Sequence, residues 1–175
     1  MILMKYSLPL RAIHWLMALM MVGLITVGWY MAGLDRSPFK FELYGWHKSF
    51  GFLALLLLVA RLLIRRRSPI PSSKGILAGW EIGLSHATHW SLYLLMLLVP
   101  LSGYIMSSIG RELTVFGLTL PNLVPQSDAL QQTAHSLHGP MAYLMLALML
   151  LHLAGALKHR LFDDRPQADV LPRML

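Results

Sequence analysis

The sequence contains no cysteine among its 175 residues, and only 13% of them are charged. The lack of cysteine excludes disulfides, thiolate metal sites and iron–sulfur clusters. A soluble domain carries about a quarter charged residues, whereas here 56% of the residues are hydrophobic and the mean hydropathy is +0.57. A core of this size cannot enclose so much apolar surface, so the composition predicts that much of it faces lipid.

Four long apolar segments account for this composition, and they cover residues 10–34, 45–64, 82–109 and 131–159. Each reaches the roughly 20 residues that cross a bilayer as a helix, and a chain in hydrocarbon must satisfy its own backbone hydrogen bonds. We therefore expect one all-α domain over residues 1–175, folded as a four-helix transmembrane bundle. The few charges near the segment ends, on Arg11, Lys48 and Arg61, are expected to reach the membrane surface.

Basic residues are divided unevenly between the two sides of this expected bundle. Of the 15 Lys and Arg residues, only four fall on the side opposite the termini: Arg36, Lys40, Lys48 and Arg111. By the positive-inside rule, we expect both termini in the cytoplasm. Much of the net charge of +7 is then a signal of topology, and nucleic acid is not expected as a partner.

The positions of the histidines carry the functional argument. Ionisable side chains inside membrane segments are costly, and they usually face the bundle interior with a partner. His138 and His152 are fourteen residues apart, which places them on nearly the same helix face and about 21 Å apart along the axis. Each has a possible partner at matching depth: His14 for His152 near the inner surface, and His47 for His138 near the outer surface.

Two imidazoles that face each other across a four-helix bundle are typical axial ligands of a haem iron. A single membrane histidine is often only a hydrogen-bonded group between helices, but four histidines that pair by depth favour the haem hypothesis. The pairs His14/His152 and His47/His138 therefore predict two b haems. Ligation by two histidines leaves no open position on the iron, which favours electron transfer.

The other histidines leave alternatives open. His135 is an alternative to His138 as the outer ligand. It lies on a different helix face from His152, whereas His138 shares that face, so His138 is preferred. His86 and His89, at the start of the third segment, are interfacial groups, alternative inner ligands, or part of a quinone or proton site. His159 lies at the inner exit of the fourth segment, where a solvated cationic end is the usual interpretation and a quinone site the alternative.

Motifs in all four segments resemble the bacterial cytochrome b561 family, and more broadly the haem-b membrane subunits of formate dehydrogenases and nickel–iron hydrogenases. They are RAIHWL at 11–16, HKSFG at 47–51, SHATH at 85–89, PLSG at 100–103 and the interval between His138 and His152. This resemblance covers nearly the whole chain. It implies a bacterial inner-membrane protein with two b haems on the four paired histidines, and electron exchange with ubiquinone. Pro140 departs from the family pattern and predicts a kink or a helix start.

Stand-alone members of this family include superoxide oxidases, which pass electrons from periplasmic superoxide to ubiquinone. Carried over to this chain, a superoxide:ubiquinone oxidoreductase activity would use the outer cations to attract the anion. They are Arg36, Lys40, Lys48 and Arg111. The alternatives are an electron-transfer subunit that serves a partner dehydrogenase or a soluble cytochrome, and a metal-ion transporter that uses the histidines as ligands.

Overall fold

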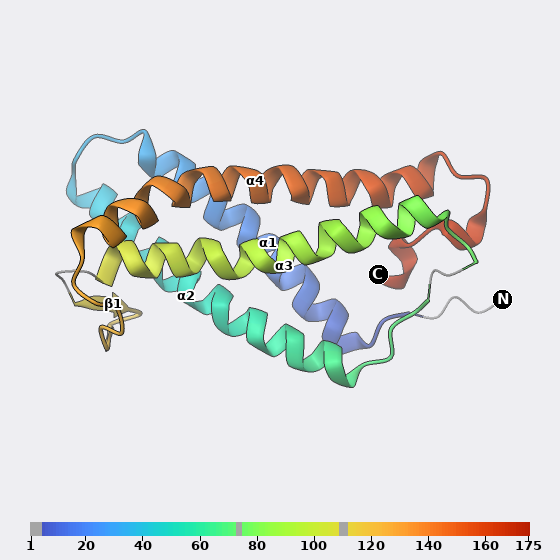
Figure 1. The fold of residues 1–175 in the computed structure, drawn as a ribbon, viewed down its shortest axis with the longest axis horizontal. Coiled ribbons are helices and arrows are strands. Elements are labelled where there is room, and N and C mark those ends of the chain that lie inside the picture. Colours follow the sequence, from blue (N-terminus) through green and yellow to red (C-terminus); the bar gives the residue numbers. More distant parts are fainter. Residues whose placement is uncertain (1–4, 73–74, 109–111) are drawn as a thin grey trace.

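The computed structural model describes residues 5–72, 75–108 and 112–175, and in these residues it shows four long helices, a short hairpin and two 3-10 turns (Figure 1). The elements are α1 Leu8–Ala32, α2 Pro38–Arg67, α3 Gly79–Ser108, β1 Leu113–Val115, β2 Leu118–Leu120, α4 Asp128–Leu161, η1 Pro166–Ala168 and η2 Leu171–Arg173. Each of the four α-helices is long and apolar enough to cross a membrane. The expected transmembrane bundle is confirmed.

All four helices begin earlier than the apolar pattern indicates, and the difference is largest for α2. α2 begins at Pro38, where the Ser37 hydroxyl accepts a hydrogen bond from the Lys40 backbone N–H at 3.2 Å. α4 begins at Asp128, capped by Ser127, and continues through Pro140, which therefore does not mark its start. A charged residue interrupts each of these first turns, Lys40 in α2 and Asp128 in α4, so a hydropathy pattern misses them, although serine caps and, in α2, a first-turn proline favour helix starts.

The helices form a bundle in which α1 packs against α2, α2 against α3, and α3 against α4. Figure 1 shows α3 and α4 side by side, with α1 and α2 crossing them at an angle. The central core draws on all four helices and consists of Met21, Ala54, Leu95, Val99 and Met145. Many large apolar side chains point outward instead, such as Leu19 and Trp90, which are both 73% exposed. Such a surface suits contact with lipid.

The hairpin closes one end of the bundle. Its two central residues, Phe116 and Gly117, both have positive φ, 49° and 81°, as a type I′ turn requires. The Phe116 backbone N–H donates to the Ser49 hydroxyl at 3.0 Å, and its ring meets Phe50 with centroids 5.5 Å apart. The hairpin therefore packs against α2 at Ser49 and Phe50, within one turn of His47.

The C-terminal segment closes the opposite end. After α4 it turns back through η1 and η2 to the start of α1 (Figure 1). There the Tyr6 backbone N–H donates to the Arg173 carbonyl at 3.0 Å, and the Trp15 indole N–H donates to the Met174 carbonyl at 2.9 Å. The start of α1 and the end of α4 consequently lie together, far from the hairpin.

Candidate functional site

The end of the bundle that carries the C-terminal segment, called the inner end below, brings His14 of α1 and His152 of α4 face to face. Their ring centroids are 6.1 Å apart and their planes are inclined at 76°. Both residues are half-buried, and each lies roughly two turns from the inner end of its helix. The structure thus brings together the pair that the sequence predicts at this depth.

Towards the hairpin, at the outer end, His47 of α2 faces His138 of α4. Their ring centroids are 6.2 Å apart and their planes are inclined at 74°. The other two helices approach these rings through glycine: a Cβ atom on Gly28 would lie 3.2 Å from His47 Cε1, and one on Gly103 would lie 3.2 Å from His138 Cε1. A larger residue at either glycine would push the ring, so the glycines set the space around this pair.

A serine fixes the orientation of His138. The Ser102 hydroxyl donates its only proton to the Val99 carbonyl at 2.7 Å, and its oxygen lies 2.9 Å from His138 Nδ1. The oxygen therefore accepts from Nδ1–H, which leaves Nε2 unprotonated and available to a metal. His47 differs, because its buried Nδ1 has no hydrogen-bond partner among the described residues.

Comparison with known proteins decides the family. The family model described as "Prokaryotic cytochrome b561" matches residues 5–175, which include both histidine pairs. The chain belongs to the prokaryotic cytochrome b561 family. It is 32% identical to "Cytochrome b561 homolog 2" of Escherichia coli (strain K12), over 98% of this chain and 91% of that protein. It is also 29% identical to "Probable superoxide oxidase CybB" of Yersinia pestis, over 97% of each chain, and 23% identical to "Cytochrome b561 homolog 1" of Escherichia coli (strain K12), over 97% of this chain and 98% of that protein.

Family membership gives the general function. The chain is a membrane cytochrome of the b561 type, an electron-transport protein of the bacterial inner membrane whose cofactor is haem b. This general function is that of an electron carrier, so family membership does not support the metal-ion transporter. The resemblance noted in the sequence is confirmed.

The spacing within both histidine pairs of this cytochrome fits an iron porphyrin. An imidazole nitrogen binds a transition metal at about 2 Å and the ring centre lies about 1 Å behind it, so two rings on opposite sides of one iron have centres about 6 Å apart. The observed separations are 6.1 Å and 6.2 Å. The ring of His89 lies closer to His152, at 5.0 Å, which leaves too little room for an iron between those two rings.

Three of the remaining histidines, His86, His89 and His159, lie at the inner end of the cytochrome in different surroundings. His86 is exposed on α3, and His89 Nδ1 lies 3.3 Å from the Ser85 hydroxyl. His159 is only 8% exposed, and its Nδ1 lies 3.0 Å from a carboxylate oxygen of Asp163. The expected solvated end at His159 is therefore wrong: the chain turns back after α4 and places an acid against the ring.

An ion-pair network surrounds His159. Glu81 at the start of α3 binds Lys158, and its carboxylate lies 3.8 Å from His159 Nε2. Arg165 pairs with Asp163 at 2.7 Å. Hydrogen bonds from Arg165 and then from His159 hold the pKa of the Asp163 carboxyl below its ordinary value. This network ties the start of α3 to the end of α4.

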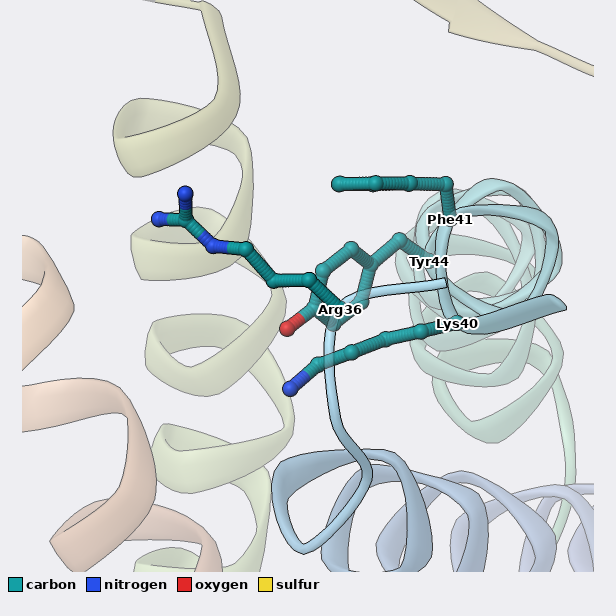
Figure 2. Close-up of a pocket in the computed structure, with 4 residues that line it drawn as sticks. All are labelled: Arg36, Lys40, Phe41 and Tyr44. Carbon is teal, nitrogen blue, oxygen red and sulfur yellow. The ribbon is translucent and has the colours of Figure 1, made fainter. Parts of the chain in front are cut away.

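At the outer end, cations and aromatic rings line a cavity of about 310 Å³ (Figure 2). Arg36 comes from the α1–α2 loop, and Lys40, Phe41 and Tyr44 come from the first turns of α2; in Figure 2 all four side chains extend to the same side. Lys40 Nζ lies 5.8 Å from the centroid of the Tyr44 ring. The structure thus brings together two of the four expected anion-attracting residues. Lys48 lies further along α2, and Arg111 lies outside the described residues.

Arg61 is the residue whose role the sequence interpretation missed. It does not reach the membrane surface as expected: its side chain is buried, at 9% exposure, and its Nε donates to the Tyr93 hydroxyl of α3 at 3.2 Å. A signal was present, because Arg61 follows His47 by fourteen residues, the interval that separates His138 from His152. That interval returns a residue to nearly the same helix face.

Proposed function

We propose that this cytochrome holds two haems, one between His14 and His152 and one between His47 and His138, and that it carries electrons from periplasmic superoxide to ubiquinone. The supporting observation is the presence of two facing histidine pairs at two depths. The fourteen residues from His138 to His152 span about 21 Å of α4, so one pair lies near each membrane surface.

The residues around the pairs suit an electron carrier. Haem b supplies one-electron chemistry at the iron, and the protein supplies ligands, spacing and electrostatics. If both histidines of a pair bind the iron, it would have no open position for oxygen. The hydrogen bond of Ser102 keeps the metal-binding nitrogen of His138 directed towards the iron.

The distribution of charge supports an orientation. The end with the start of α1 and the end of α4 carries most of the Lys and Arg residues. The positive-inside rule therefore favours a cytoplasmic position for that end and for both termini, and a periplasmic position for the hairpin end. The cavity lined by Arg36 and Lys40 then lies on the periplasmic side.

Superoxide fits this arrangement because it is a small anion. A pocket with two cations raises the local concentration of an anion and its rate of encounter. A relative at 29% identity carries the name of a probable superoxide oxidase. Two superoxide ions lose one electron each and become dioxygen, while one ubiquinone gains two electrons and two protons. His86, His89 and His159, at the inner end, are the candidate quinone residues.

The test begins with the visible spectrum of the purified, haem-loaded protein. We expect b-type bands on reduction with dithionite, and the same bands within milliseconds of a superoxide pulse, followed by quinol formation when a ubiquinone analogue is present. The double variant Arg36→Gln/Lys40→Gln should react about tenfold more slowly at low ionic strength, and the difference should shrink as salt is added. Arg66→Gln, an exposed change near the inner end of α2, serves as the matched control.

Two results would count against the proposal, and they are distinct. A colourless protein after expression with ample haem would remove the two-haem site. A protein that dithionite reduces but superoxide does not would exclude superoxide as the donor. The second result would favour an electron-transfer subunit that receives electrons from a partner dehydrogenase or a soluble cytochrome.

A further inference from the structure

Fourteen-residue intervals link the inner and outer levels on every helix of the bundle. On α1 and α3 a residue at the inner level is followed fourteen positions later by a residue at the outer level. On α2 and α4 the outer residue comes first and the inner residue fourteen positions later. The inner level consists of His14, Arg61, His89 and His152, and the outer level consists of Gly28, His47, Gly103 and His138. By helix periodicity, Arg61 therefore occupies the helix face that His47 occupies at the outer level.

Arg61 is buried among groups that cannot neutralise it. It interacts electrostatically with the three inner histidines, which are His14, His89 and His152. Its Nε donates a hydrogen bond to the Tyr93 hydroxyl, and its guanidinium carbon lies 5.8 Å from the centroid of the Tyr93 ring. Within residues 5–72, 75–108 and 112–175, no ion pair includes Arg61.

A guanidinium inside a membrane bundle normally faces an anion. Charged groups at this depth are costly, and they usually pair with an opposite charge or mark a ligand site. The guanidinium is always charged, and its planar array of N–H donors matches a carboxylate. The porphyrin of haem b carries two carboxylates on its propionate side chains, so the inner cofactor itself supplies an anion of the required chemistry.

We propose that Arg61, oriented by Tyr93, binds a propionate carboxylate of the inner haem and raises the reduction potential of that haem. This inference rests on the proposed presence of a haem between His14 and His152. Reduction adds one electron to the iron and lowers the net charge of the haem by one. A nearby cation therefore stabilises the reduced form relative to the oxidised form, and it also offsets the propionate charge that would favour the oxidised form.

The test is a redox titration of the haem-loaded protein, followed by absorbance, in detergent without quinone. Arg61→Gln should retain two haems per chain, but the equilibrium of the inner haem should shift at least tenfold towards the oxidised form, which is 59 mV for a one-electron couple. Arg61→Lys should restore most of the shift, and Arg66→Gln should show none. Repeating the titration in a His47→Ala background, in which the inner haem is expected to remain, assigns the shifted component.

Each outcome bears on the inference. Unchanged potentials in Arg61→Gln would overturn it, and so would a shift that appears only when quinone is added, because the anion would then be on the quinone. Loss of the inner haem in Arg61→Gln with retention in Arg61→Lys would support it. If both variants lose that haem, Tyr93→Phe decides: a smaller shift in the same direction supports the inference, and no shift overturns it. A wild-type protein without haem would instead contradict the proposed function.

Discussion

At the outer level of the bundle, the two helices that carry no proposed ligand present glycine to the histidine rings: Gly28 from α1 and Gly103 from α3. At the inner level, the two helices without a proposed ligand present Arg61 from α2 and His89 from α3. His89 lies 5.0 Å from the His152 ring, and Arg61 is buried beside Tyr93. At the outer level the two helices without a proposed ligand therefore leave space beside the histidine rings, and at the inner level they add polar side chains there.

This difference shows how one helical repeat can produce two unlike sites. The same periodicity positions all eight residues, so the backbone gives both levels similar ring separations. The identity of the two non-ligand residues then sets the surroundings. Glycine provides space without charge, so at the outer level we expect hydrogen bonds to the proposed ligands to influence the haem more than charged groups do. Arginine and a third histidine add charge and donors at the inner level, where quinone is expected.

The most direct way to break the comparison is to remove one ligand at each level. We expect His138→Ala to lose the outer haem and His152→Ala to lose the inner haem, so that each variant binds about one haem per chain instead of two. The remaining haem should differ in spectrum and in potential between the two variants. A pyridine haemochrome assay with protein quantification measures the ratio.

His135→Ala provides the control for this pair of variants. His135 is exposed on α4, one turn from His138, and its loss should leave two haems per chain. If His135→Ala lost a haem while His138→Ala kept both, the assignment of the outer ligand would be wrong. If His152→Ala kept both haems, His89 would become the candidate inner ligand.

A smaller change sharpens the view that hydrogen bonding controls the outer level. Ser102→Ala removes the acceptor for His138 Nδ1–H, and loss of such a partner typically lowers metal-site affinity by about tenfold or more. We expect weaker binding of the outer haem, measured by transfer of haem to apomyoglobin, and unchanged retention of the inner haem. Ser91→Ala is the control, because the described residues show no hydrogen bond from Ser91 to a histidine. Equal effects on both haems would contradict a local role.

The sequence predicts the four spans and the two histidine pairs because both depend on local regularities. A hydropathy run records which segment lies in lipid, and a step of about 100° per residue records which side chains share a face. Two histidines on one helix at a fourteen-residue interval are visible without knowing any other helix. The partner at each depth then follows from the alternation of helix direction.

Features that depend on contacts between distant residues could not be predicted in this way. Arg61 near a segment end is compatible with a side chain that reaches the surface, and only the approach of Tyr93 from α3 keeps it inside. The surroundings of His159 likewise depend on α3, because the carboxylate of Glu81 lies 3.8 Å from its Nε2. Lys40 and Glu42 end the hydropathy pattern short of the first turn of α2, although its serine cap is a local signal.

The smallest expected effect comes from Asp163→Asn, a change that should affect the inner end of the bundle and leave the outer end unchanged. Asp163 holds the inner end through ion pairs, whereas the hairpin holds the outer end through hydrogen bonds between uncharged groups. At neutral pH, Asp163→Asn should speed hydrogen exchange in residues 158–172 and leave residues 113–120 unchanged. It should also lower the thermal midpoint slightly, because the Arg165 side chain that pairs with Asp163 is half exposed to solvent, and ion pairs with an exposed partner contribute little.

The stability that Asp163→Asn loses depends on pH in a definite direction. Because pairing lowers the pKa of Asp163 in the folded protein, its contribution to stability is complete above the ordinary carboxylate pKa of about 3.9 and is lost as the pH falls through the lower folded value. The gap in thermal midpoint between wild type and Asp163→Asn should therefore stay constant from about pH 8 to pH 5 and narrow only below about pH 4. A gap that widened on acidification, or faster exchange in the hairpin, would show that the ion pairs do not act on the inner end alone.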